Sequence, residues 1–384
     1  KIIMSSKFTI IGAGISGLML GCILKKNSID CSIYERSSQI SEFDTGITIS
    51  PNGYQLLEHV NILENLRDVS CRPLNVVYRN VNGSTIKSIP LNLFGKVITM
   101  NRKELIRLLH DQYLSMNGSI FFNHEVIDID IEQKKIIFKD LDKHSYENIA
   151  ACDGINSNVR EKGCNIKKPP YYSGYSAWRG IGNSDSKNIN IYLGNDSHVV
   201  CYPINDKLET SFTGIFKTNS SSGESWKREG SHNELSKDLS SYDTFLHSLF
   251  TSSNKVFRWS LYQRDKLASF KTKDITLLGD AAHPMLPFLA QGASMALEDA
   301  FIFGNLANHF NNDYEKIQSN YDLLRLKRAH TIQSSSEKQA IYNHVSNPLL
   351  LKIRNFVLKN TNIAMRRTEN IYNYNALNEL NKIL

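Results

Sequence analysis

The stretch TIIGAGISGLMLG, residues 9–21, constrains this chain more than any other. It holds Gly12, Gly14 and Gly17 in GxGxxG spacing, after a short β-rich run and at the start of a helix-like segment. In such a turn the first glycine permits the tight bend and the second lets the backbone approach a pyrophosphate. The third lets the helix pack closely on the strand. The pattern predicts a dinucleotide site of the Rossmann type.

A second predicted strand, CSIYE (residues 31–35), ends on Glu35, 18 residues past Gly17. A carboxylate there can accept hydrogen bonds from a ribose hydroxyl, and an acidic residue suits the unphosphorylated ribose of NAD or FAD. Arg36 follows at once, and it either pairs with a cofactor phosphate or is a solvated surface charge. The chain contains only this one GxGxxG, so we expect its second half to complete the same site.

The later stretch ITLLGDAAHPMLPFLAQGASMALEDA, residues 275–300, has the features of that second half. An apolar strand ends on Asp280, and Gln291-Gly292 then open a helix-like segment with bare backbone N–H groups. Burial of a carboxylate is costly unless it is hydrogen-bonded, and a ribityl chain offers a row of hydroxyls. A helix N-terminus suits a group that becomes negative, as a flavin ring does on reduction. These features favour FAD.

Together with CDGINSNVR (152–160) and SAWRGI (176–181), these stretches resemble the group A flavoprotein aromatic hydroxylases, the family of salicylate hydroxylase and 3-hydroxybenzoate 6-hydroxylase. The resemblance spans nearly the whole chain. It implies FAD bound without a covalent link and reduced by NADH or NADPH. It also implies monooxygenation, through a flavin 4a-hydroperoxide, of a ring activated by a hydroxyl or amino group.

The resemblance also implies roles for single residues. A histidine that titrates near neutral pH can be the general base for a phenol, and His198 is our candidate, with a structural role as the alternative. Tyr202, on the same face of a predicted strand, would orient the substrate, with core packing as the alternative. Gln291 would hydrogen-bond substrate or flavin, with an amide that braces the loop as the alternative. Arg179 would bind a carboxylate or the flavin edge, and His283 would support the loop. The predicted cofactor-binding residues are Gly12, Gly14, Ser16, Gly17, Glu35, Arg36, Ile47, Arg102, Val126, Asp153, Asp280 and Gly292.

The predicted fold class is α/β with an α+β insert. A Rossmann-like FAD-binding domain (residues 4–170 and 271–340) is interrupted by an antiparallel-sheet substrate domain (171–270), which is rich in Tyr, Trp, Val and Thr. A helical segment (341–384) follows. One departure from the family is Ala290, which replaces a glycine common just before the Gln-Gly pair and leaves the local loop geometry open.

Composition limits the cofactors, the cellular compartment and the partners that we expect for this chain. Six scattered cysteines without a CxxC pair argue against a metal site and for a reducing compartment, so we expect a cytoplasmic protein with no metal. The net charge of +7 forms no basic stripe with aromatics, and apolar runs are too short to span a bilayer. We therefore expect no nucleic acid or membrane partner. The expected partners are dioxygen, a nicotinamide and a small aromatic molecule, and a homodimer stays open.

Three alternatives stay open. A flavin-dependent epoxidase or hydroxylase of a polyene, quinone or polyketide would share the cofactor site but lack a base in its pocket. A flavin halogenase normally carries paired tryptophans, whereas Trp178, Trp226 and Trp259 are far apart. A flavin-dependent sensor would keep the fold without turnover. The sequence does not choose the substrate, the position of hydroxylation, or NADH over NADPH.

Overall fold

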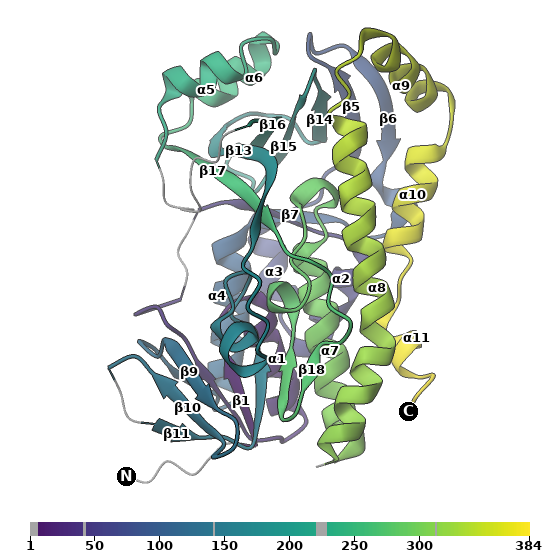
Figure 1. Ribbon diagram of the computed structural model, residues 1–384. Coiled ribbons are helices and arrows are strands. Elements are labelled where there is room, and N and C mark those ends of the chain that lie inside the picture. Colours follow the sequence, from purple (N-terminus) through teal and green to yellow (C-terminus); the bar gives the residue numbers. More distant parts are fainter. Residues whose placement is uncertain (1–6, 41–43, 141–142, 220–228, 312) are drawn as a thin grey trace.

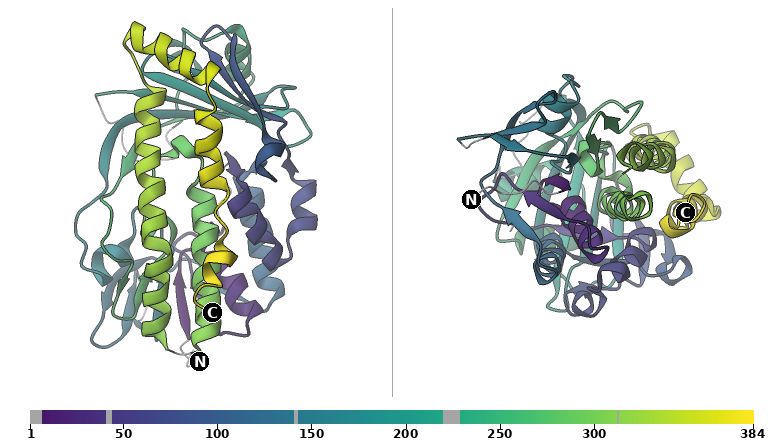
Figure 2. Two further views of the ribbon diagram at one scale, coloured as in Figure 1. Left: turned by 90° about the vertical axis from the view of Figure 1, so that its right-hand side faces the viewer. Right: turned by 90° about the horizontal axis from the view of Figure 1, so that it is seen from below.

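A computed structural model describes residues 7–40, 44–140, 143–219, 229–311 and 313–384 (Figure 1). A mostly parallel sheet with its helices lies at one end and a mostly antiparallel sheet at the other. Long helices from the last third of the chain run along one side of both (Figure 2). The predicted fold class, an α/β fold with an inserted antiparallel sheet and C-terminal helices, is confirmed.

The parallel sheet is built around the first strand, whose four residues FTII are all buried. A continuous apolar run of this kind is typical of a strand covered on both faces. Only the edge strand β18 runs antiparallel to its neighbour. In order across the sheet the strands are β18 (Lys271–Thr272), β19 (Ile275–Leu277), β12 (Asn148–Ala151), β1 (Phe8–Ile11), β2 (Cys31–Tyr34) and β8 (Ser119–Phe121).

Four helices bury their apolar side chains in the core around this sheet. The helix α4 begins after Asn101, whose side chain accepts a hydrogen bond from the Lys103 N–H, and it buries Leu105, Leu108 and Leu109 on one stripe. The helices α7 and α8 lie side by side, as Figure 2 shows. The four helices are α1 (Ile15–Lys26), α4 (Arg102–Ser115), α7 (Gly292–Phe310) and α8 (Tyr314–Asn343).

The second large sheet takes strands from two separate parts of the chain. Residues 171–270 supply five strands, as the sequence predicts, but a hairpin from residues 75–90 adds two more by parallel pairing of Ile189–Leu193 with Asn75–Asn80. In order the strands are β17 (Val256–Gln263), β13 (Tyr171–Asn183), β16 (Glu209–Lys217), β15 (Ser197–Pro203), β14 (Ile189–Leu193), β5 (Asn75–Asn80) and β6 (Thr85–Pro90).

That hairpin bears on the predicted domain boundaries, which placed residues 75–90 in the FAD-binding part. Nothing local distinguishes a hairpin that joins one sheet from a hairpin that joins another, because the partner strand lies more than a hundred residues away. We keep the division into an FAD-binding and a substrate domain as a prediction. Residues 4–6, 41–43, 141–142, 220–228 and 312 of the predicted ranges lie outside the described residues.

Smaller elements complete the fold. Among the described residues, no helix is long and apolar enough to cross a membrane. The small sheets are β11 (Lys143–Ser145), β10 (Lys135–Phe138) and β9 (Val126–Asp130), and β3 (Gly46–Ile49), β7 (Ile98–Asn101) and β4 (Ser70–Cys71). The other α-helices are α2 (Pro51–Leu57), α3 (Leu63–Asp68), α5 (His232–Asp238), α6 (Thr244–Thr251), α9 (Pro348–Asn360), α10 (Ile363–Tyr372) and α11 (Ala376–Leu380).

Candidate active site

The glycine turn between β1 and α1 has the geometry that its sequence predicts. Gly12 has φ +103°, a conformation that costs a glycine nothing and other residues much. A Cβ on Gly17 would lie 1.9 Å from the carbonyl oxygen of Gly12, so only glycine lets helix and strand pack this closely. A Cβ on Gly14 would meet no atom within 4 Å. The backbone at Gly14 is therefore open to a ligand at the N-terminus of α1.

Glu35 holds its carboxylate beside this turn. The Ala13 N–H donates to Glu35 Oε2 over 2.8 Å, and the Ser37 N–H donates to Oε1 over 2.9 Å. Each oxygen keeps a lone pair for a hydroxyl of a ligand. Arg36 is exposed. The geometry suits the predicted ribose contact of Glu35, and it leaves both interpretations of Arg36 open.

A second group of predicted residues lies where β19 ends. Gly279 has φ +58° and turns the chain, and a Cβ there would lie 3.3 Å from Ser16 Oγ at the start of α1. Asp280 is exposed, whereas the sequence suggested a buried carboxylate, because this turn directs it out of the strand. Protein still surrounds it closely enough that desolvation raises its pKa, against the attraction of His283 and Arg102.

Arg102 is the cationic counterpart of Asp280. Burial lowers the pKa of its guanidinium, and the nearby Asp280 carboxylate raises it. Yet within the described residues neither side chain forms a hydrogen bond or an ion pair. Two opposite charges that attract each other without a direct bond suit a polar ligand that contacts both.

The N-terminus of α7 faces the same region with bare backbone. Gln291 is its N-cap residue but makes no side-chain cap, and its first turn has no acidic residue. A Cβ on Gly292 would meet nothing within 4 Å. Ala290 has φ +50°, a left-handed conformation that glycine adopts freely and alanine adopts at a cost. The free N–H groups and the helix dipole favour a developing negative charge.

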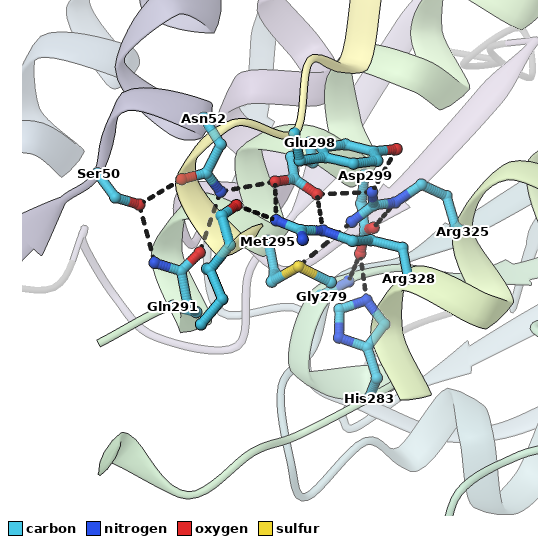
Figure 3. A network of polar contacts seen from close by, with 12 residues as sticks. Ser50, Asn52, Gly279, His283, Gln291, Met295, Glu298, Asp299, Arg325 and Arg328 are labelled. Carbon is cyan, nitrogen blue, oxygen red and sulfur yellow. Dashed lines mark hydrogen bonds and ion pairs between the residues drawn. The ribbon is translucent and has the colours of Figure 1, made fainter. Parts of the chain in front are cut away.

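The Gln291 side chain braces the loop, which was the alternative to its predicted hydrogen bond with substrate or flavin. It is 2% exposed, its Nε2 donates to Ser50 Oγ over 2.9 Å, and its Oε1 accepts from Asn52 Nδ2 over 3.0 Å (Figure 3). The amide therefore braces the start of α7 against the start of α2. A hydrogen bond from this side chain to a substrate remains a prediction.

A buried ionic network beside Gln291 was not expected from the sequence (Figure 3). Arg325 on α8 donates to Glu298 Oε2 over 2.6 Å and to Asp299 Oδ1 over 2.7 Å, and all three side chains are fully buried. Asp299 also accepts from the Gly279 N–H over 2.7 Å and lies 2.6 Å from His283 Nε2. The network thus fixes the turn that presents Asp280, and His283 supports the loop as predicted.

The charged and polar neighbours of Asp299 keep its carboxylate ionised. Burial alone would raise the pKa of Asp299, but His283, Arg325 and the Gly279 N–H hold it at about 2. Glu298 also receives hydrogen bonds from Asn52 Nδ2 and Arg328. The sequence signal was present, since adjacent acids at 298–299 occupy an otherwise apolar helix, but their cationic partner lies on the next helix.

Arg179 in β13 is a half-buried cation, and no carboxylate of the described residues pairs with it. Its guanidinium lies 4.5 Å from the centroid of the Trp259 ring, its Nη1 is 3.4 Å from Thr45 Oγ1, and its Nε has no partner among the described residues. Burial lowers its pKa to about 10, with Tyr202 raising it and Arg102 lowering it further. Arg102 and Tyr202 therefore both lie close enough to Arg179 to change its pKa.

His198 and Tyr202 lie on β15, four residues apart and both buried. The Nδ1 of His198 is 2.9 Å from Nε2 of His344, so one of the two ring nitrogens donates to the other. Phe288, in the loop that leads to α7, packs 5.5 Å from the His198 ring. Burial, His344 and Arg354 lower the pKa of His198 well below its usual value, and the ring is neutral at pH 7.

The remaining predicted residues are Asp153 after β12, Val126 in β9 and Ile47 in β3. Asp153 closes the turn after β12: its carboxylate accepts from Ser157 Oγ over 2.6 Å and from the Val159 N–H over 3.1 Å. Its side chain is thereby occupied within its own loop. Val126 starts β9, and its carbonyl accepts from Asn158 Nδ2 over 2.7 Å. Ile47 is half-buried in β3. Cofactor contacts of these three residues remain predictions.

Comparison with known proteins identifies the family. A family model described as an FAD binding domain matches residues 6–335. The chain belongs to this family, and its resemblance to the group A flavoprotein hydroxylases is confirmed. The glycine turn, the Arg102 and Asp280 charges and the open start of α7 fit FAD as its cofactor.

Named relatives extend over most of the chain. A 3-amino-4-hydroxybenzoate 2-monooxygenase of Streptomyces cremeus is 25% identical over 354 residues, which is 88% of each chain. A 3-hydroxybenzoate 6-hydroxylase of Polaromonas naphthalenivorans is 26% identical over 356 residues, 86% of this chain and 87% of that one. A salicylate hydroxylase solved as a substrate complex shares the fold, with a TM-score of 0.83 at 21% identity, covering 98% of this chain and 97% of that one.

Proposed function

We propose that this flavoprotein is an FAD-dependent, NAD(P)H-consuming monooxygenase that hydroxylates a small aromatic acid bearing a hydroxyl or amino group. The two relatives reported above are named for hydroxylated or aminated benzoates. The observation that supports an acidic substrate is Arg179, a half-buried guanidinium whose buried Nε has no hydrogen-bond partner and which pairs with no carboxylate of the described residues. A charged group buried without a partner is costly, so a ligand carboxylate is its natural complement.

Gly12, Gly14, Ser16 and Gly17 would hold the pyrophosphate side of FAD, Glu35 a ribose, and Arg102 with Asp280 the polar chain that leads to the ring. FAD supplies hydride acceptance and the delivery of one oxygen atom from dioxygen. The start of α7 would lie against the ring edge that becomes negative. The Glu298–Arg325 network would act by holding the Gly279 turn, and Gln291 would hold the start of α7.

His198 is proposed as the group that takes the substrate proton. A phenol that loses its proton gains electron density on the ring, which promotes transfer of an electrophilic oxygen. His198 is neutral at pH 7 and can accept a proton, and its bond to His344 fixes the orientation of its ring. Tyr202, beside Arg179, would orient the substrate hydroxyl. Burial raises the pKa of Tyr202, so it is a hydrogen-bond donor near neutral pH.

The proton role predicts that His198→Ala lowers kcat about 100-fold or more while bound flavin, measured by absorbance after gel filtration, is retained. His344→Asn removes a group that lowers the pKa of His198. We therefore expect the acid limb of the kcat profile, which lies below pH 6.5 in the unaltered protein, to move to higher pH. The exposed His309→Ala is the control. Flavin loss in His198→Ala would assign a structural role to His198.

The proposed binding of the substrate carboxylate by Arg179 predicts a second result. Arg179→Gln should raise KM for a hydroxybenzoate about 10- to 100-fold, since a charge-assisted hydrogen bond contributes about 1.5–3 kcal/mol. The corresponding carboxamide should bind both proteins equally. Arg258→Gln is the matched control, because Arg258 lies in the same sheet, stacks on Trp178 and has the carboxylate of Asp238 nearby. Loss of flavin rather than of acid affinity would place Arg179 at the cofactor.

The activity itself is tested by NADH or NADPH consumption with hydroxy- and aminobenzoates, with the product identified as the substrate plus one oxygen atom by mass spectrometry. An enzyme that retains FAD but accepts only uncharged polyenes, quinones or polyketides would replace the proposal with the epoxidase alternative.

We also propose a cytoplasmic location, in line with six free cysteines, and a homodimer, to be tested by sedimentation.

A further inference from the structure

The helix α9 turns an apolar face toward solvent. Leu349, Leu350, Ile353 and Phe356 are 65%, 52%, 49% and 68% exposed. At 100° per residue these four positions fall on one stripe. Single exposed apolar residues are common, but four large ones gathered on one face mark an interaction surface.

The opposite face of α9 fixes the helix to the body of the protein. Leu358 is 1% exposed, and the buried Arg354 donates to the carbonyl of Asn343 over 3.3 Å. Asn355 Nδ2 donates to Asn80 Oδ1 over 2.8 Å, and the Asn347 side chain caps the helix by accepting from the Leu349 N–H over 2.9 Å. The apolar stripe is therefore presented by an anchored helix.

The charge around the stripe has one sign. Residues 338–368 contain no Asp or Glu but include Lys338, Lys352, Arg354, Lys359, Arg366 and Arg367. Lys352 and Lys359 are exposed and lie along one border of the stripe, since at 100° per residue they are about 40° and about 60° from Phe356 around the helix, on the side away from Leu350. A second copy docked by the same face would set these lysines against lysines, with no carboxylate of the helix to pair with them.

We propose that α9 docks on the surface of a bilayer that contains anionic lipids, with its apolar stripe at the headgroup boundary and its lysines at the phosphates. An apolar stripe flanked by lysines is typical of helices that lie in the membrane–water interface. The helix also lies at one extremity of the molecule, where a flat surface can reach it (Figures 1 and 2). This proposal revises the expectation of no membrane partner, which rested on the absence of a long apolar segment.

The test is co-sedimentation of the full-length flavoprotein with vesicles of phosphatidylcholine alone or mixed with phosphatidylglycerol. Binding should be stronger to the anionic vesicles and weaken with added salt. The double variant Leu349→Ser/Phe356→Ser should lower the partition coefficient about tenfold or more. Lys352→Gln/Lys359→Gln should weaken binding to anionic vesicles only. Leu323→Ser is the control, because Leu323 is 71% exposed but lies on α8.

Three results would overturn the proposal. One is equal sedimentation with and without anionic vesicles. Another is binding that the serine pair leaves unchanged. The third is a lipid-free dimer that the serine pair converts to a monomer in sedimentation velocity, which would assign the stripe to a second copy of the chain. None of these readouts depends on turnover, so they separate this proposal from the proposed hydroxylation.

Discussion

Gly17→Ala is expected to destabilise the protein by about 3 kcal/mol or more and to abolish FAD retention. The new Cβ would stand 1.9 Å from the Gly12 carbonyl oxygen and 3.2 Å from Ile10 Cγ2. Forced overpacking costs about 1–3 kcal/mol when side chains can move, and here the obstacle is backbone. Relief requires α1 to shift from β1, which opens the turn that receives the pyrophosphate. Denaturant unfolding and flavin absorbance measure the two effects.

Gly14→Ala is the matched control for this prediction. A Cβ there meets no protein atom within 4 Å, so the flavin-free protein should unfold at the same denaturant concentration as the unaltered chain. FAD should nevertheless bind more weakly, because the methyl group occupies the space through which the pyrophosphate approaches. If Gly17→Ala were as stable as Gly14→Ala, the close packing of α1 on β1 would be wrong.

Arg325→Met is expected to lower the free energy of unfolding by about 3–5 kcal/mol, the usual cost when one partner of a buried ion pair is removed. Two carboxylates would then lose their common guanidinium, with its contacts of 2.6 Å to Glu298 and 2.7 Å to Asp299. Arg107→Met is the control, since Arg107 pairs with Glu104 and Asp111 on an exposed helix face. A surface pair contributes about 0–1 kcal/mol.

The same variant should change how stability depends on pH. Asp299 has a folded-state pKa of about 2 against an ordinary value of 3.8, so its stabilisation is complete above about pH 4 and is lost as the pH falls toward 2. Removal of Arg325 raises the folded-state pKa toward the ordinary value of 3.8, so the loss of stability between about pH 4 and 2 should become smaller. Unfolding by urea between pH 3 and 7 measures this shift. An unchanged acid limb would show that Arg325 does not hold the charge of Asp299.

The cofactor half of the site was predictable because its geometry is local. Gly12, Gly14 and Gly17 meet their constraints within one strand-turn-helix unit, and Glu35 ends the adjacent strand. The start of α7 at Gly292 was predictable for the same reason, since a run of turn residues precedes an apolar helix. Backbone conformation and the neighbours one turn away decide such features, and both are present in a short stretch of sequence.

The substrate half depended on partners that no short stretch contains. The His198 ring is hydrogen-bonded to His344, which lies at the end of α8. The Gln291 amide is hydrogen-bonded to Ser50 and Asn52.

The sequence by itself determined the fold class, the dinucleotide turn and the family, because these depend on residue type at short spacing. Only the tertiary structure decided that residues 75–90 join the second sheet and that Arg325 neutralises Glu298 and Asp299. It also decided that no carboxylate of the described residues pairs with Arg179. Strand pairing and charge neutralisation join residues far apart in the chain, and a partner can be chosen only after the chain has folded.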